Sequence, residues 1–318
     1  MSENLLEIRH LKKYFDTPKG KLHAVDDVTF SIEKGKTLGI VGESGCGKST
    51  LGRVILRLIE PTDGEILFEG KDLRKMSGRE MRKMRSKMQL IFQDPFSSLN
   101  PRKNILQTLE EPLKYLGKYP DSDMRFTRVV ELMDTVGLDR RLIGAYPHEL
   151  DGGRRQRIGI ARALAMEPEF IVCDEPVSAL DVSIQAQVLN LLQEIQKNLG
   201  LTYIFITHNL SVAKHISDSI AVMYLGRIVE MASSDELFSN PMHPYTRALL
   251  SAIPTPNLHN RGQRIILKGE LVSPIEPKPV CRFLNRCYCC KEKCKQTEPE
   301  LLEVLPNHFV SCYLYKDN

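Results

Sequence analysis

The stretch Gly42-Glu43-Ser44-Gly45-Cys46-Gly47-Lys48-Ser49-Thr50 decides the fold, because it fits the pattern G-x4-G-K-[ST] of a phosphate-binding P-loop. Glycines let the backbone wrap closely around a polyphosphate, and the N–H groups that begin the following helix point at the anion. In such a loop Lys48 reaches the β- and γ-phosphates and Ser49 binds Mg²⁺. We expect nucleotide contacts from Gly42, Ser44, Gly45, Cys46, Gly47, Lys48, Ser49 and Thr50.

The segments on either side of this loop have the context that the motif requires. The short apolar run from Leu38 to Val41 predicts a buried strand. The run after the loop has the period of an amphipathic helix that ends before Pro61. Its expected apolar face consists of Leu51, Val54, Ile55, Leu58 and Ile59. A chance glycine-rich turn would rarely have both flanks, so a site for a nucleoside triphosphate is the favoured interpretation.

The composition is that of an ordinary globular protein, with 318 residues, 42% hydrophobic and 26% charged. We expect a large domain over residues 1–255 and a smaller one over 256–318. No apolar run approaches the about 18 residues of a membrane-spanning helix, and the first ten residues lack a signal-peptide core, so we expect a cytosolic chain. A net charge of +4 does not argue for nucleic acid, and the basic stretch 71–87 is interpreted as a solvated helical face.

A second apolar run, from Phe170 to Cys173, ends in the acidic pair Asp174 and Glu175. A P-loop enzyme needs such a pair on a neighbouring strand. The aspartate at the strand tip holds Mg²⁺ directly or through water, and the adjacent glutamate polarises the attacking water. An acid pair alone is common in α/β proteins, but its position about 120 residues after a P-loop favours the functional interpretation.

Three further pieces follow in a fixed order. Gln93 ends the expected strand from Met88 to Phe92, Ser178-Ala179-Leu180-Asp181 closely follows the acid pair, and His208 ends a strand from Tyr203 to Thr207. Each piece is weak by itself, because a histidine or glutamine at the end of a strand is more often structural. Only their combination is specific.

In this combination, residues 5–255 resemble the ATP-binding subunit of an ABC transporter. The resemblance implies an α/β P-loop ATPase with a mostly parallel core sheet, an antiparallel β portion near residues 5–70 and a helical subdomain near 96–160. It implies that Glu175 is the catalytic base, that His208 contacts the γ-phosphate, and that Gln93 reaches Mg²⁺ and the water. Tyr14 resembles the aromatic residue on which adenine stacks, with Phe15 as a rival and a core tyrosine as the alternative.

Two further segments resemble the ATPases of peptide importers, namely Gln93 to Arg102 and Met242 to Leu249. The first is similar to the F-type of the paired dipeptide, oligopeptide and nickel importer ATPases. This implies a heterodimer with a second ATPase subunit, two membrane permeases and an external substrate-binding protein, at the cytoplasmic face of the membrane. The rival interpretation is a soluble ABC ATPase not coupled to transport, which usually carries two cassettes or a long coiled coil.

The signature of this family, Leu-Ser-Gly-Gly-Gln, is altered here to Leu150-Asp151-Gly152-Gly153-Arg154. In the family this segment faces the γ-phosphate held by the partner subunit, and its serine donates a hydrogen bond there. An ionised Asp151 only accepts hydrogen bonds and is repelled by a polyanion. Arg154 or Arg155 could offset that charge, or Asp151 could simply cap the helix that follows. Both interpretations stay open at this point.

Six of the eight cysteines fall between Cys281 and Cys312, and in a reducing compartment they argue against disulfides. Four have the spacing Cys281-x5-Cys287-x6-Cys294-x17-Cys312, with Cys289 and Cys290 between them. Four thiolates suit Zn²⁺ or an iron–sulfur cluster, and the spacing lacks the pairs of a zinc ribbon. The segment resembles the extension of peptide-importer ATPases in which some members bind a [4Fe–4S] cluster, which implies these four ligands. Free thiols are the alternative.

Overall fold

The computed structural model describes residues 4–253, 264–269 and 273–315. The chain forms two compact units, which are described separately here. Among the described residues, the first unit contains Glu33–Lys36 and Lys75–Ile204, and the second contains Asn4–Ile32, Thr37–Arg74 and the chain from Phe205 onward. The domain boundary expected at residue 255 lies outside the described residues and stays a prediction.

The second unit contains an antiparallel sheet with the strand order β2-β1-β4-β5. Its strands are β1 (Asn4–Thr17), β2 (Gly20–Glu33), β4 (Asp63–Phe68) and β5 (Lys71–Asp72). In β2 the side chains of Val28, Phe30 and Ile32 are buried while the residues between them are exposed, which is the period of a half-buried strand. This sheet confirms the antiparallel portion predicted near residues 5–70.

The same unit contains the strand that leads into the P-loop. The order β11-β12-β10-β9-β3 joins β11 (Leu302–Leu305), β12 (His308–Val310), β10 (Arg227–Ser233), β9 (Ser219–Tyr224) and β3 (Thr37–Val41). Only β3 and β9 run parallel in this group, whereas the other neighbours are antiparallel. This group of strands is therefore mixed, and only its β3–β9 pair fits the mostly parallel core sheet that was predicted, because the turn Leu225-Gly226, with both φ angles positive, folds β10 directly back onto β9.

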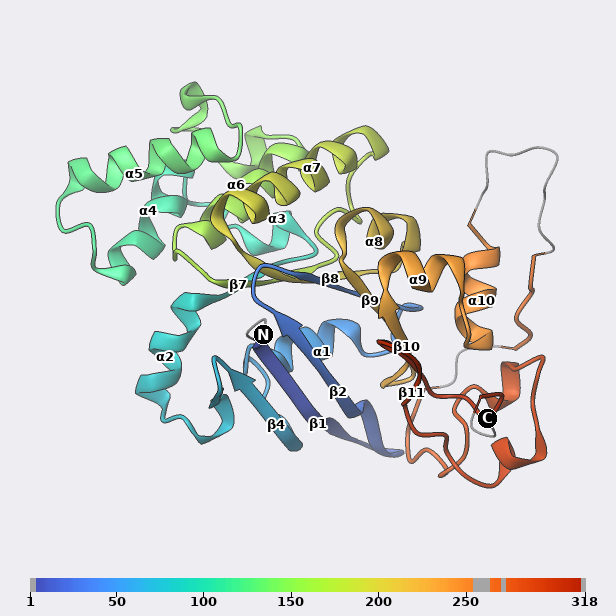
Figure 1. Ribbon diagram of the computed structural model, residues 1–318. Helices are drawn as coiled ribbons and strands as arrows, with labels where there is room; N and C mark the ends of the chain where they lie inside the picture. The colour runs from blue at the N-terminus through green and yellow to red at the C-terminus, as the bar shows by residue number, and fades with distance from the viewer. Residues whose placement is uncertain (1–3, 254–263, 270–272, 316–318) are drawn as a thin grey trace. The chain divides into compact units, whose positions relative to one another are not determined.

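The helices of this unit are α1 (Lys48–Ile55), α8 (Leu210–Ile216), α9 (Ser234–Ser239) and α10 (Pro244–Ser251). Helix α1 is shorter than predicted: the chain turns at Arg57, whose φ is 50°, and Leu58 is 51% exposed. Helix α10 and the C-terminal segments, orange to red in Figure 1, lie side by side. Tyr224, Tyr245 and Phe283 form the aromatic part of the core that joins them.

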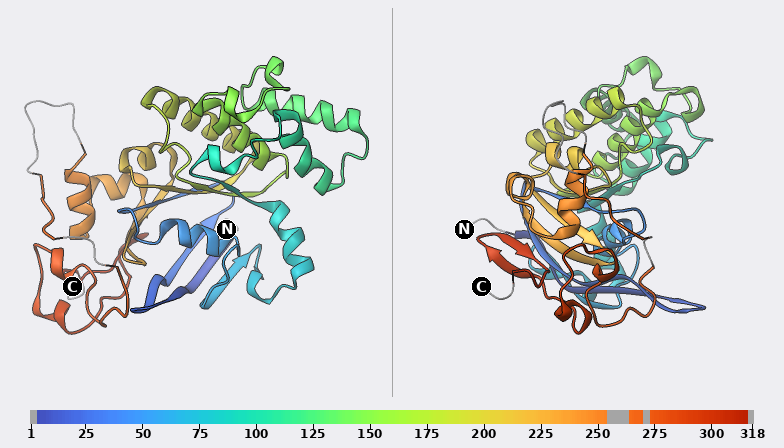
Figure 2. Two further views of the ribbon diagram at one scale, coloured as in Figure 1. Left: turned by 180° about the vertical axis from the view of Figure 1, so that it is seen from behind. Right: turned by 90° about the vertical axis from the view of Figure 1, so that its right-hand side faces the viewer.

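In the first unit, the strands β6 (Met88–Ile91) and β7 (Phe170–Asp174) pair in parallel. The unit also contains α2 (Gly78–Lys87), α3 (Pro95–Ser98), α4 (Ile105–Leu116), α5 (Ser122–Thr135), α6 (Gly152–Leu164) and α7 (Val182–Leu199). Helices α4, α5, α6 and α7 lie together in all views (Figures 1 and 2), as expected for the helical subdomain near 96–160. The last strand, β8 (Thr202–Thr207), begins in this unit and ends in the other.

Helix α2 contains the basic stretch that the sequence placed on a solvated helical face. Ser77 and Glu80 form a capping box at its start, and only Met81 and Met84 of the helix are buried. Short 3-10 helices occur at Leu73–Lys75, Arg140–Leu142, Pro147–Glu149, Leu284–Arg286 and Glu292–Lys295. Within the described ranges, no helix is both long enough and apolar enough to cross a membrane.

Candidate nucleotide site

The P-loop connects the end of β3 to the start of α1, as the motif predicts. Gly47 is the N-cap of α1 with a φ of 107°, and an added Cβ would lie 2.0 Å from the carbonyl oxygen of Ala24. Only glycine fits this position. No side chain caps α1, and a helix start of this kind is suited to an anion. Ser44 and Gly45 are exposed, whereas Ser49 and Thr50 are half-buried in the first turn.

Lys48 already has partners within the loop. Its side chain is 4% exposed, and its Nζ donates to the carbonyl oxygens of Gly42 at 2.8 Å and Glu43 at 3.0 Å. A bound polyphosphate would offer this ammonium oxygens of greater negative charge. The thiol of Cys46 is buried behind the loop and burial raises its pKa, so any contact of Cys46 with the anion would come from its backbone.

Tyr14 on β1 is held within the protein. Its ring stacks on His23 with centroids 3.8 Å apart, and its hydroxyl donates to Asp26 at 2.5 Å. Burial raises the pKa of Tyr14, and its hydrogen bond to Asp26 raises it further. Burial alone would raise the pKa of Asp26, but the hydrogen bond from Tyr14 and the charge of Arg282 outweigh this and lower it to about 2. Phe15 follows in the strand and therefore points to the opposite face.

In the first unit, the acidic pair lies at the end of β7, as predicted. Asp174 is the last residue of the strand and is 2% exposed. Glu175 has a φ of 47°, a left-handed conformation that is costly for any residue except glycine and that is concentrated at functional sites. Gln93 Nε2 donates to Glu175 Oε2 at 3.1 Å. The structure thus brings together two residues that are 82 positions apart and that the sequence assigned to one reaction.

The altered signature forms the start of α6. An added Cβ at Gly152 would lie 3.0 Å from the Leu180 side chain and one at Gly153 would lie 2.7 Å from the Ile184 side chain, so both glycines allow these side chains to pack closely. Leu180 belongs to the segment Ser178–Asp181, where Ser178 Oγ donates to the carbonyl oxygen of Glu175 at 3.0 Å. This packing links the signature to the segment that follows the acidic pair.

Asp151 caps the helix that follows it and pairs with Arg154, whereas its position toward a partner's phosphate stays a prediction. Its Oδ1 accepts the backbone N–H of Arg154 at 2.8 Å, which caps α6, and its Oδ2 lies 3.3 Å from the Arg154 guanidinium. Both side chains remain about half exposed, at 51% and 54%. Arg155 is engaged elsewhere, because it donates twice to the carbonyl oxygen of Leu150 and lies over the ring of Phe96. Arg154 is therefore the residue that offsets the charge of Asp151.

The remaining predicted nucleotide contact, His208, is exposed and directly follows β8. The P-loop, Tyr14 and His208 belong to the second unit, whereas Gln93, Asp174, Glu175 and the signature belong to the first. Sequence analysis missed the role of Asp26, His23 and the arginines that surround Tyr14. No local motif marks these residues, and the arginines reach Asp26 only through contacts with a distant part of the chain.

Within the residues that it describes, the structure gives no support for the predicted metal site in the cysteine segment. Cys294 is buried and Cys281, Cys287 and Cys312 are half-buried, all four as free thiols. Burial raises the pKa of Cys281 to about 12 and that of Cys287 to about 11, and the neighbouring thiols add to both shifts. Within the described part of the chain, no three His, Cys, Asp or Glu side chains are grouped so that they could hold a metal ion. Cys281 and Cys287 instead pack on the aromatic core as neutral groups, so the predicted [4Fe–4S] or Zn²⁺ site lacks structural support.

Comparisons with protein families match two parts of the chain. The sequence model of the ABC transporter family matches residues 25–178, and that of the oligopeptide/dipeptide transporter C-terminal region matches residues 229–294. Among curated proteins, the chain is 52% identical to the oligopeptide transport ATP-binding protein AppF of Bacillus subtilis, over 98% of both chains. It is also 52% identical to a putative peptide import ATP-binding protein of Brucella ovis, over 97% of both.

Solved structures of ATP-binding cassettes share the fold. The dimeric ATP-binding cassette MJ0796, in a post-hydrolysis state with ADP and Pi, aligns with a TM-score of 0.66 at 29% identity. The alignment covers 72% of this chain and 98% of that one. The protein cbiO1 of Clostridium perfringens, part of the ABC transporter complex cbiONQ, aligns with a TM-score of 0.67 at 28% identity, over 75% and 92% of the two chains.

Substitutions at Lys48 and Glu175 are expected to separate nucleotide binding from hydrolysis. Lys48→Ala removes the charge that faces the phosphates, so the Kd for ATP should rise about tenfold or more. Glu175→Gln should bind ATP with little change but hydrolyse it about 100-fold more slowly, because an amide cannot act as a base. Nucleotide titration and single-turnover phosphate release measure the two effects. Hydrolysis at the parent rate by Glu175→Gln would show that the base is another residue.

Substitutions at Asp151 are expected to separate its two roles. Asp151→Ala removes the cap and should lower the free energy of unfolding by about 1 kcal/mol, whereas Asp151→Ser keeps a cap and should change it little. The double change Asp151→Ser and Arg154→Gln should increase hydrolysis at the site completed with a partner, because it removes a carboxylate facing the phosphate. Thermal unfolding and steady-state ATPase assays report on these effects, and unchanged hydrolysis would leave capping as the sole role.

Proposed function

Because the chain belongs to the ATP-binding subunits of oligopeptide and dipeptide ABC transporters, we propose that the ATP it hydrolyses drives peptide import through partner permeases. The observation that carries this proposal is the match of the C-terminal region, residues 229–294, to a model specific for such transporters. The match of the ATPase core, in contrast, is to the ABC transporter family in general and does not indicate a cargo. The alternative, a soluble ABC ATPase not coupled to transport, is not favoured, because the relatives matched over the full length are named as transport or import proteins.

The chemical roles of the site residues are part of this proposal. Glu175 acts as the base that polarises water, and its hydrogen bond with Gln93 holds the carboxylate in place. Bound Mg²⁺ would neutralise charge on the phosphates. The residues proposed to hold it are Ser49, Gln93 and Asp174. His208 contacts the γ-phosphate, and Gly152 and Gly153 face the nucleotide of a partner subunit.

For the adenine base, the contacts of Tyr14 favour its rival Phe15. One face of the Tyr14 ring is covered by His23 and its hydroxyl is bonded to Asp26, which leaves it as a structural residue. Phe15 is half-buried on the other face of the strand, with Lys13 Nζ 4.9 Å from its ring centroid. An aromatic ring with an adjacent cation suits a purine that carries phosphates. We therefore place the adenine on Phe15.

The proposed partners are a second ATPase subunit and two permeases, with an external protein that delivers the substrate. The altered signature supports a heterodimer, since a partner with an intact serine would give the pair at least one complete site. Two exposed aromatic residues near Gln93 support a permease contact in the first unit: Phe92 is 40% exposed and Phe96 is 57% exposed. Exposed aromatic groups next to arginines are typical of interface anchors. The chain would then be peripheral, at the cytoplasmic face of the membrane.

Affinity purification from membranes tests the transport proposal. A tagged chain should copurify with two permeases and a second ATPase subunit, and Phe96→Ser should lower the permease yield without lowering ATP binding. Addition of the second ATPase subunit should raise hydrolysis, because the isolated chain has only its altered signature to complete a site. A soluble tagged chain that hydrolyses ATP cooperatively by itself and retains no permease would contradict the proposal.

The adenine assignment is tested by a matched pair of substitutions on β1. Phe15→Ala should raise the Kd for ATP about tenfold, since stacking on an aromatic ring contributes about 1 kcal/mol or more. Tyr14→Phe keeps the ring and removes only the hydroxyl bond to Asp26, so it should leave the Kd nearly unchanged. In a nucleotide titration, an unchanged Kd for Phe15→Ala would contradict the placement of the adenine on Phe15.

The metal hypothesis stays part of the proposal, with support limited to the sequence spacing and the mutual electrostatic influence of the thiols of Cys281, Cys287, Cys294 and Cys312. A [4Fe–4S] cluster or Zn²⁺ would require these groups to move and lose their protons. Anaerobically purified protein should contain iron and acid-labile sulfide, or zinc, and Cys294→Ser should remove it. Elemental analysis that finds neither metal would leave four structural thiols.

A further inference from the structure

The C-terminal extension contacts the P-loop directly through Arg286. Its guanidinium forms a bidentate ion pair with Glu43, with NH1–Oε2 at 2.7 Å and NH2–Oε1 at 3.0 Å. The two residues are 243 positions apart, and their side chains are only 11% and 30% exposed. A planar guanidinium that binds a carboxylate with two hydrogen bonds fixes the orientation of the carboxylate and also neutralises its charge. This contact therefore differs from an ordinary surface ion pair.

The backbone N–H, the carbonyl oxygen and the carboxylate of Glu43 each have a different hydrogen-bond partner. Its N–H donates to the Tyr245 hydroxyl at 3.0 Å, its carbonyl oxygen accepts from Lys48 at 3.0 Å, and its carboxylate pairs with Arg286. Lys48 is the residue expected to reach the phosphates. The position of Glu43 thus influences both the conformation of the loop and the place of its lysine.

Arg286 is itself fixed by packing. Its guanidinium lies over the Tyr224 ring, 5.9 Å from the centroid, and Tyr224 packs edge-on against Tyr245 and Phe283. Phe283 is 2% exposed and lies three residues before Arg286 in the same segment. The aromatic core therefore fixes the segment that carries Arg286, and the guanidinium of Arg286 binds the P-loop at Glu43.

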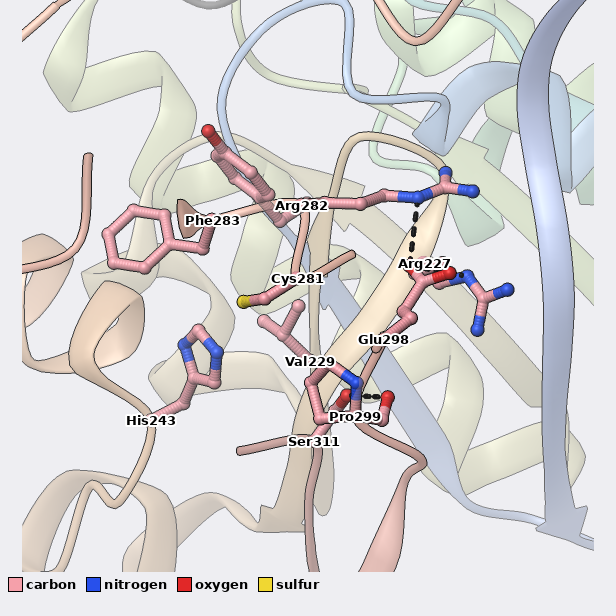
Figure 3. A pocket seen from close by; sticks show the side chains of 10 residues that line it. Arg227, Val229, His243, Cys281, Arg282, Phe283, Glu298, Pro299 and Ser311 are labelled. Carbon is pink, nitrogen blue, oxygen red and sulfur yellow. Dashed lines mark hydrogen bonds and ion pairs between the residues drawn. The ribbon is translucent and has the colours of Figure 1, made fainter. Parts of the chain in front are cut away.

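A second arginine of the same segment, Arg282, fixes the region of Tyr14. Arg282 and Phe283 leave the chain in different directions, and Arg282 extends toward Glu298 (Figure 3), which accepts from its Nε at 3.0 Å. Its terminal nitrogens donate to the Asp26 carboxylate and the Leu225 carbonyl oxygen. Asp26 in turn accepts from Tyr14. Residues 281–287, which we call the arginine segment, hold two separate parts of the nucleotide-binding unit.

We propose that Arg286 is a positioning residue for ATP binding, which holds the P-loop at Glu43 and neutralises this carboxylate beside the polyphosphate. The carboxylate of Glu43 belongs to the loop that wraps a strongly negative ligand, and without its partner it would repel that ligand. With Arg286 in place, the loop presents a neutral pair and the charge of Lys48 acts on the phosphates unopposed. The inference depends on ATP binding alone and not on the peptide cargo.

Removal of Arg286 tests this role in the full-length chain with MgATP as the probe. Arg286→Gln should raise the Kd for MgATP about tenfold, which corresponds to ~1.4 kcal/mol. The KM for ATP should rise in parallel, while kcat should stay within about twofold, because Gln93 and Glu175 are unchanged. Arg286→Lys keeps the charge but loses the fork, so its Kd should lie between those of the parent and Arg286→Gln.

The double variant Glu43→Gln with Arg286→Gln separates this role from general support of the fold. Because it removes the unpaired carboxylate, it should bind MgATP at least about threefold more tightly than Arg286→Gln alone. Lys295→Gln is the matched control: it removes one positive charge from an exposed pair of the same extension and should leave the Kd unchanged. If thermal unfolding shows that Arg286→Gln is not folded, the Kd for MgATP is compared instead between Arg286→Lys and the double variant Arg286→Lys with Glu43→Gln.

Two outcomes would overturn the inference. A folded Arg286→Gln chain with a Kd within about twofold of the parent would show that the ion pair does not act on the nucleotide. A double variant as weak as Arg286→Gln alone would show that the arginine acts by some route other than Glu43.

Discussion

The conformation of the P-loop is the constraint on which the second unit depends. The carbonyl oxygens of Gly42 and Glu43 both accept from Lys48, and the loop backbone passes close to Ala24 of β2. Gly47 removes the steric conflict with Ala24, and Tyr245 and Arg286 hold Glu43 from outside. The loop is therefore organised for an anion before the anion arrives, which lowers the ordering cost of binding.

This constraint explains why the extension is packed into the nucleotide-binding unit. β12 extends the sheet of β3 and β9 through β10, and Phe283 completes the aromatic core under α10. Within that sheet, the buried carboxylate of Glu230 accepts from two backbone N–H groups and from His308 of β12. The extension thus contributes the third partner of this buried carboxylate. In the first unit, Gln93 donates to the carboxylate of Glu175, whose backbone has a positive φ.

The sequence predicted those features whose chemistry is local. Motif and periodicity predicted the P-loop and the strand before it, the separate strand that ends in the acidic pair, and the helical region near 96–160. The structure contains all of these elements. The sequence did not predict the end of α1, because the positive φ at Arg57 and the exposure of Leu58 break a helical pattern that continues in the sequence. For the adenine the sequence favoured Tyr14 with Phe15 as a rival, since two adjacent aromatic residues look alike until the partner of each face is known.

The sequence by itself determined that this chain binds and hydrolyses a nucleotide, because glycine spacing, one lysine and a strand-end acid pair are sufficient for that chemistry. Only the tertiary structure decided how the loop is held. Arg286 and Glu43 are far apart in the chain, and no sequence motif contains both residues. Their pairing depends on the packing of Phe283, Tyr224 and Tyr245, and side-chain packing between distant segments has no signature in a single sequence.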